Sequence, residues 1–206
     1  MNSRTKHTHL AGLMLALTVL IAGCSSTPTV RYDLNSLDPL TTTPTDGALL
    51  NYRLAEVTVP EPINTTALMV RQPDNSLMLL SHDQWVASLQ EVVQTAMADT
   101  LTDSIGTPPT PQSMQARGVN HIEVALDIRQ FEMRPGQFAS ISALWQINFG
   151  GHKNASITCF TNTRMTVKPG VAALVAAQQR NLQILGQQIA TAMQTTAAPR
   201  DSRCHG

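Results

Sequence analysis

The chain has 206 residues, with 14 basic and 14 acidic side chains, so its formal net charge is zero. This balance argues against nucleic acid as a partner and against strong docking on anionic lipid, because both require an excess of positive charge. Only 14% of the residues are charged, whereas about 25% is usual in soluble domains. Much of the surface is therefore expected to be uncharged and polar, or covered by partners.

Residues 1–23 have the order of a bacterial export signal peptide. Arg4 and Lys6 supply positive charge, residues 10–22 form an apolar stretch too short to span a bilayer, and small residues follow. We therefore expect this segment to be removed from the mature protein. Without Arg4 and Lys6, 12 basic and 14 acidic residues remain, which gives a net charge of −2.

Cys24 directly follows Ile-Ala-Gly, an order that resembles the lipobox of bacterial lipoproteins. In lipoproteins the cysteine carries acyl chains, and two or three chains hold a protein on a membrane effectively permanently. The alternative is a signal peptide with an accidental cysteine. Lipoproteins that are retained on the inner membrane usually have an aspartate directly after the cysteine. This chain has Ser25 at that position instead. The resemblance implies covalent lipid on Cys24, an outer-membrane anchor and a body in the periplasm, with no other cofactor.

Residues 24–51 are predicted to be the lipidated cysteine and a flexible linker, because serine, threonine, proline and aspartate dominate without periodicity. A coil of this length spans roughly 25–30 Å, enough to hold a domain away from the membrane. Within it, Tyr32-Asp33-Leu34 is expected to dock on the domain. The folded domain is predicted over residues 52–194, and residues 195–206 form a tail without any pattern.

The first half of the domain has the pattern of strands followed by a helix. Alternation predicts a strand over residues 54–59 and a hairpin from residues 68–71 and 77–80. Ser81 and Gln84 fit a capping box, which predicts that the helix begins there. Its apolar stripe is Trp85, Leu89, Val92, Val93, Ala96, Met97, Leu101 and Ile105.

The second half repeats this order with longer elements. Period-two patterns predict an antiparallel meander of strands that start near Ile122, Ala139 and Ala155, and a helix follows from Val171 to about Gln194. The element order is β-β-β-α-β-β-β-α. This order predicts an α+β fold with a mostly antiparallel sheet and two helices packed on one face.

Two cysteines remain if Cys24 is acylated. Cys159 and Cys204 form an even pair in an oxidising compartment, and a bridge between them would contribute about 3–4 kcal/mol in the chain-entropy model. The alternative is two unpaired thiols, with Cys159 buried in a strand and Cys204 in a frayed tail.

No pattern in the sequence indicates catalysis or a metal site. The histidines lack the spacing of metal ligands, and neither a nucleophile elbow nor a phosphate-binding loop is present. We therefore expect a protein that is not an enzyme. Trp85 and Trp145, together with Arg71 and Tyr32, are expected to act either as core anchors or as residues of an oligomer interface.

An ordered set of motifs then resembles one family. The lipobox is followed by Tyr32-Asp33-Leu34, by Val57-Thr58-Val59-Pro60 and by a strand that ends in Arg71. Gln84-Trp85 opens the next motif, and a strand ending in Phe131, the Trp145 strand and an alanine-rich last helix complete the set. Together these resemble the PqiC family of auxiliary lipoproteins of ABC-type and MCE-domain transport systems.

This resemblance implies a non-catalytic outer-membrane lipoprotein of an intermembrane lipid transport system. Its implied partner is an MCE-domain protein anchored in the inner membrane, its cargo is phospholipid, and some relatives assemble as homo-oligomeric rings. We expect the chain to dock the periplasm-spanning MCE protein to the outer membrane. The alternatives are a lipidated assembly factor for an outer-membrane protein and a lipidated hydrolase or binding protein.

Overall fold

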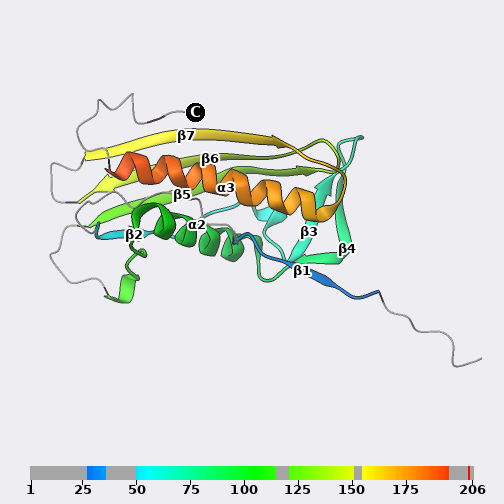
Figure 1. The fold of residues 1–206 in the computed structure, drawn as a ribbon, viewed down its shortest axis with the longest axis horizontal. Coiled ribbons are helices and arrows are strands. Elements are labelled where there is room, and N and C mark those ends of the chain that lie inside the picture. Colours follow the sequence, from blue (N-terminus) through cyan, green and yellow to red (C-terminus); the bar gives the residue numbers. More distant parts are fainter. Residues whose placement is uncertain (1–26, 36–49, 115–120, 151–154, 195–203, 205–206) are drawn as a thin grey trace, which may run out of the picture.

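A computed structural model describes residues 27–35, 50–114, 121–150, 155–194 and 204. Within them lie seven strands, two α-helices and two short 3-10 helices (Figure 1). In chain order these are β1 (Val30–Tyr32), β2 (Tyr52–Leu54), η1 (Glu61–Ile63), β3 (Ala67–Arg71), β4 (Leu77–Trp85), α2 (Leu89–Ile105), η2 (Gln112–Met114), β5 (Ile122–Arg134), β6 (Phe138–Phe149), β7 (Ala155–Thr166) and α3 (Val171–Gln194).

The described strands form two sheets. The larger has the order β2-β5-β6-β7, in which β5, β6 and β7 are the antiparallel meander and β2 is parallel to β5. The smaller has the order β1-β4-β3, with an antiparallel β3–β4 hairpin and a parallel β1. The predicted α+β class, element order and mostly antiparallel pairing are confirmed. The additional short strand β1 and the division into two sheets were not predicted.

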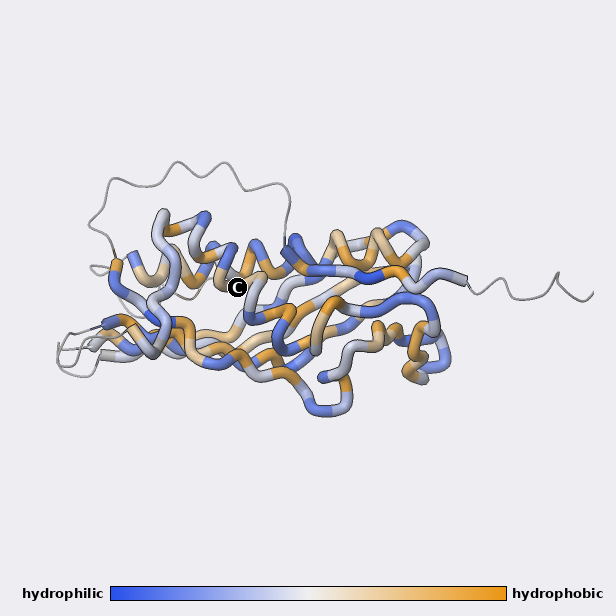
Figure 2. The backbone as a smooth tube through the Cα atoms, turned by 90° about the horizontal axis from the view of Figure 1, so that it is seen from below, coloured by the Kyte–Doolittle hydropathy of each residue, from blue (hydrophilic) through white to orange (hydrophobic). Residues whose placement is uncertain are grey.

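The two helices cover one face of the larger sheet. Figure 1 shows α3 lying across β5, β6 and β7 with α2 beside it, and Figure 2 shows the helices and strands as two layers. The helices approach closely at Gly186, where an added Cβ would lie 2.5 Å from the Cγ2 atom of Thr100. Within the described residues, neither helix combines the length and apolar character needed to cross a bilayer.

A β-bulge in β5 shifts its apolar residues from even to odd positions, so that they remain on the helix side of the sheet. Val124, Leu126 and Ile128 are buried at even positions, and the register shifts between Ile128 and Gln130. One extra residue moves every later side chain to the opposite face. Phe131 and Met133 therefore share the helix side with Ile141 and Ala139, their partners on β6. The outward positions after the bulge hold Gln130, Glu132 and Arg134.

The start of the first long helix was predicted wrongly. Residues 81–85 continue β4, and α2 begins after Ser88, whose side chain accepts from the Glu91 amide while Glu91 bonds back to Ser88. The Ser81-Gln84 pattern fits the same capping box, but pairing with β3 and β1 keeps these residues extended. The stripe from Leu89 to Leu101 is buried as predicted, whereas Trp85 belongs to a strand.

The strand predicted over residues 54–59 is shorter and lies earlier. β2 covers Tyr52–Leu54, and the pairing with β5 resumes only as a bridge between Thr58 and Asp127. Between them the Val57 amide donates to the Gln94 side chain at 2.7 Å rather than to a strand. A side chain of α2 thus replaces a ladder hydrogen bond and fixes this segment against the helix.

The last helix has the predicted bounds, and two of its polar residues are buried. Gln178 and Asn181 are both 0% exposed. Their amide groups donate to the backbone carbonyls of Glu132, Ser140 and Ala139 at 2.9–3.3 Å. Buried polar groups need such partners, and here they join α3 to β5 and β6.

Part of the predicted linker belongs to the folded domain, and the expected docking of Tyr32-Asp33-Leu34 is confirmed. β1 pairs with the end of β4, Leu34 is buried in the core, and the Tyr32 hydroxyl donates to Asp83 at 3.0 Å. Only residues 25–29 separate Cys24 from β1. The remainder of the predicted linker, residues 36–49, lies outside the described residues.

Candidate functional site

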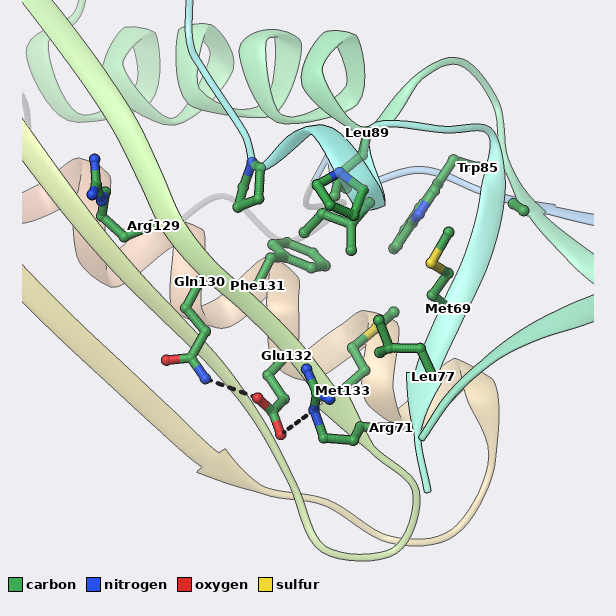
Figure 3. A pocket seen from close by; sticks show the side chains of 14 residues that line it. Met69, Arg71, Leu77, Trp85, Leu89, Arg129, Gln130, Phe131, Glu132 and Met133 are labelled. Carbon is green, nitrogen blue, oxygen red and sulfur yellow. Dashed lines mark hydrogen bonds and ion pairs between the residues drawn. The ribbon is translucent and has the colours of Figure 1, made fainter. Parts of the chain in front are cut away.

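A pocket of about 260 Å³ lies between the β3–β4 hairpin and the second half of β5 (Figure 3). Most of its lining is apolar, and four charged or amide side chains from β3 and β5 border it. The lining residues are Pro60, Pro62, Ile63, Ala67, Met69, Arg71, Leu77, Trp85, Leu89, Arg129, Gln130, Phe131, Glu132 and Met133.

Local sequence features explain why space remains here. Pro60 and Pro62 end the segment that follows β2, because proline lacks the amide hydrogen that a ladder needs. After the bulge, the second half of β5 has β6 on one side and no ladder hydrogen bonds to β3 on the other. Phe131 projects into the resulting gap toward Leu89 (Figure 3).

A charge cluster closes one side of the pocket and joins the two sheets. The Glu132 carboxylate is 7% exposed and accepts from Arg71 on β3 at 3.1 Å, from Arg134 at 2.5 Å and from Gln130 at 2.8 Å. Both arginines also donate to Asn75 in the β3–β4 turn, at 3.0 and 2.9 Å. The hairpin is thereby fixed to the end of β5.

The surroundings of Glu132 keep its carboxylate ionised. Burial is the largest single influence and acts against the charge, but the hydrogen bonds from Arg134 and Gln130 and the positive charges of Arg71 and Arg134 outweigh it. The pKa of Glu132 therefore lies below its ordinary value. Its donors come from both sheets, with Arg71 on β3 and Gln130 and Arg134 on β5. The carboxylate therefore stabilises the junction of the two sheets.

The two tryptophans, expected either in the core or at an interface, are both buried in the chain itself. Trp85 is 3% exposed, contacts Phe131 edge-to-face at 6.1 Å between ring centroids, and forms one wall of the pocket. Trp145 is 1% exposed, and its indole nitrogen donates to the Thr161 hydroxyl at 2.9 Å. Both side chains are therefore core anchors, and Arg71 and Tyr32 join elements within the chain.

The remaining predicted site residues lie apart from the pocket. Cys159 on β7 and Cys204 form a disulfide with a Cα–Cα distance of 5.4 Å, which brings Cys204 against the larger sheet. Cys24 lies outside the described residues. The pocket itself was not predicted from the sequence. Its signal there is the shift of apolar positions from even to odd between Ile128 and Phe131.

The chemistry available at this site is that of binding. Its walls suit an aliphatic or aromatic group, and its charged border is occupied by mutual ion pairs. Among the residues that the structure describes, no three histidine, cysteine or acidic side chains come together as metal ligands. Fold and pocket together define a two-layer α+β domain with an apolar pocket at the junction of two sheets.

The sequence comparison identifies the family. Residues 32–190 match the family of ABC-type transport auxiliary lipoprotein components, and the chain belongs to this family. Its members are lipoproteins that assist a transporter, so the family is one of transport components and not of enzymes. Membership indicates a membrane-anchored protein that associates with an ABC-type transporter. No curated protein matches the chain significantly.

Two solved structures share the fold. One, an uncharacterized protein, superposes with a TM-score of 0.61 at 16% identity, over 80% of this chain and 97% of the other. The second, a protein from Xanthomonas campestris described under the family DUF330, gives a TM-score of 0.50 at 17% identity, over 79% and 89% of the two chains. At such identities the likeness concerns the fold alone.

Proposed function

We propose that this chain is the outer-membrane lipoprotein of an MCE/ABC-type intermembrane lipid transport system. In this role it docks a periplasm-spanning MCE protein, anchored in the inner membrane, to the outer membrane, and phospholipid is the cargo. The observation that carries the proposal is the family match, which begins at residue 32, only eight residues after the lipobox cysteine Cys24. A transport auxiliary domain thus starts almost directly at a membrane anchor.

The physical need for such a dock follows from the cost of exposing lipid to water. Each acyl methylene that leaves an apolar environment costs about 0.8 kcal/mol, so a phospholipid crosses the periplasm only inside a sheltered conduit. A tethered domain without a reactive centre can hold the distal end of that conduit at the membrane. The pocket between the two sheets supports this role, because buried apolar anchors commonly dominate protein interfaces.

We infer that the pocket receives one apolar side chain of the MCE partner. Crosslinking the tagged, lipidated chain in cells and identifying the captured protein by mass spectrometry tests the proposal. Met69→Asp places a charge in the pocket and is expected to reduce recovery of the MCE protein at least tenfold. Leu144→Asp is the control, because Leu144 is 40% exposed on the opposite face of the larger sheet and does not line this pocket.

The outcome also discriminates the alternatives. Recovery of an MCE protein supports the proposal, recovery of only an outer-membrane barrel protein indicates an assembly factor, and turnover of a small molecule indicates a hydrolase. Light scattering of the chain produced without lipid tests the homo-oligomeric ring. A mass several times that of one mature chain is expected, and a strict monomer at high concentration contradicts the ring.

A further inference from the structure

Exposed apolar side chains are concentrated on the small sheet. Eight large hydrophobic residues stand exposed in the described part of the chain, and five of them lie on β1, on β4 or directly after β4. We call these five the anchor-side patch: Val30, Leu77, Met78, Leu79 and Val86, of which Leu77 also lines the edge of the pocket. Exposed apolar side chains that are concentrated in one region of a soluble domain often mark a site that contacts another protein or a membrane.

The start of β4 is also an open sheet edge. β1 pairs with β4 only at residues 83–85, whereas β3 pairs with β4 from Leu77 onward. One side of residues 77–82 therefore has no neighbouring strand among the described residues, and neither proline nor charge interrupts residues 77–81. Soluble proteins commonly protect such edges with charge, proline or a bulge. The pairing of β4 with β3 is irregular between Leu79 and Gln84, but residues 77–79, whose apolar side chains are exposed, pair regularly with β3 and include neither charge nor proline.

The covalent chain fixes how far this patch can lie from the anchor. Five residues, 25–29, separate Cys24 from Val30, so six peptide steps span at most about 20 Å. Val30 pairs with Asp83, and Leu79 lies four residues from Asp83 along β4, which is about 13 Å. Figure 1 shows β1, β3 and β4 together at one end of the molecule. An anchor at Cys24 therefore holds this end close to the bilayer.

We propose that the anchor-side patch is a second membrane contact, which lies on the phospholipid surface of the membrane that holds the lipidated Cys24. This inference rests on the lipidation of Cys24 in the proposed function. The sequence predicted a long linker that holds the domain away from the membrane, whereas in this arrangement the domain lies against the bilayer in a fixed orientation. A second, weaker attachment at the same end of the domain restricts its rotation, because this contact becomes intramolecular once the lipid anchor is in place.

Charges around the patch define how it meets the membrane. Asp74, in the β3–β4 turn, accepts hydrogen bonds from the hydroxyl and amide of Ser76, which lower its pKa and keep it ionised. A charged turn does not enter the acyl region, so the hairpin lies along the surface rather than inserting by its tip. Arg31 is exposed beside Val30, and a cation at this position suits lipid phosphates.

A tryptophan introduced on the patch tests the contact. The full-length lipidated protein is reconstituted in vesicles of phosphatidylethanolamine and phosphatidylglycerol in which part of the lipid carries bromine on its acyl chains. Leu79→Trp is expected to lose about half of its added emission relative to the wild type, because interfacial groups lie at the boundary of headgroups and acyl chains. Phe160→Trp is the control, since Phe160 on β7 is 56% exposed and Leu79 is 57% exposed.

Each outcome decides the inference. Quenching of Leu79→Trp alone supports it, whereas equal quenching of both variants or of neither overturns it. If Leu79→Trp is shielded from aqueous acrylamide without quenching by brominated lipid, a protein such as a second copy covers the patch and the membrane contact is rejected. Far-ultraviolet circular dichroism of both variants checks that the fold is unchanged.

Flotation of the same vesicles separates this inference from the proposed function. Protein that floats with the vesicles but shows no quenching at position 79 retains its Cys24 anchor, and only the second contact fails. Protein that remains behind lacks the anchor, and both ideas then fail together, because the chain-length argument begins at Cys24.

Discussion

The larger sheet buries most of its apolar side chains, whereas the small sheet leaves several of its apolar side chains exposed. β5, β6 and β7 are 12 or 13 residues long and bury one face under α3, whereas β1 and β3 have three and five residues and leave apolar side chains exposed beside them. Long paired strands with a covered face stabilise the fold. The small sheet contributes less burial and presents surface instead, which is the division expected of a domain that must contact a membrane and a partner.

The largest effect is expected inside the larger layer. Trp145→Ala removes a 1%-exposed indole and its hydrogen bond to Thr161, and is expected to lower the free energy of unfolding by about 3–5 kcal/mol. Urea unfolding followed by circular dichroism measures this loss. Trp145→Phe retains a ring and should cost clearly less. A loss below about 1 kcal/mol for the alanine variant would show that this layer does not dominate stability.

The disulfide on β7 is expected to have the next largest effect. Cys204→Ser breaks the bond to Cys159 without leaving a cavity at the buried cysteine, and is expected to cost about 3–4 kcal/mol in the chain-entropy model. Reduction of the wild type should produce the same loss. Mass mapping without reducing agent checks the pairing directly, and free thiols at both positions contradict it.

The junction between the two sheets is predicted to depend on pH. Glu132→Gln removes the charge that holds Arg71 and Arg134, with an expected cost of about 1–3 kcal/mol at pH 7. Because the folded-state pKa of Glu132 is lowered, its stabilisation is present above the unfolded value, about 4.3, and is lost as pH falls through the folded value.

The difference in unfolding free energy between wild type and Glu132→Gln should therefore shrink as the pH falls from 7 to 3. Urea unfolding at several pH values measures it. Glu61→Gln, at an exposed position of η1, is the control and should show no such trend. A difference that stays constant over this range would mean that Glu132 does not hold the sheets together through its charge.

The smallest effect tests where α2 begins. Ser88→Ala removes the capping box with Glu91 and is expected to cost about 1 kcal/mol. Ser81→Ala, in the extended part of β4, should change stability by less than about 0.5 kcal/mol. The same unfolding measurement compares the two variants, and the reverse order would restore the helix start predicted from the sequence.

Periodicity predicted the long elements well and the junctions poorly. The helix over Val171–Gln194 and the three-stranded meander each extend over enough residues for their periods to be unmistakable. The boundary between β4 and α2 was missed because Ser81 and Ser88 both fit a capping box, and only pairing with distant strands decides between them. Local patterns carry no information about such competition.

The pocket could not be predicted for a related reason. Pro60, Met69, Trp85 and Phe131 come from four separate segments and meet only after the two sheets diverge. The burial of Gln178 could not be predicted either, because it depends on carbonyl partners on β5 and β6 that are distant in the sequence. The broader family of ABC-type transport auxiliary lipoproteins, in contrast, was indicated by an ordered set of short motifs that need no tertiary information.

Substitution of the anchoring cysteine tests the central claim most directly. Cys24→Ser removes the sulfur that would carry the lipid, and membrane fractionation of cells that express it shows where the protein goes. The account predicts loss of the protein from the outer-membrane fraction and a weakened permeability barrier, with the folded domain unchanged. A Cys24→Ser protein that still fractionates with the outer membrane and preserves the barrier would contradict the account.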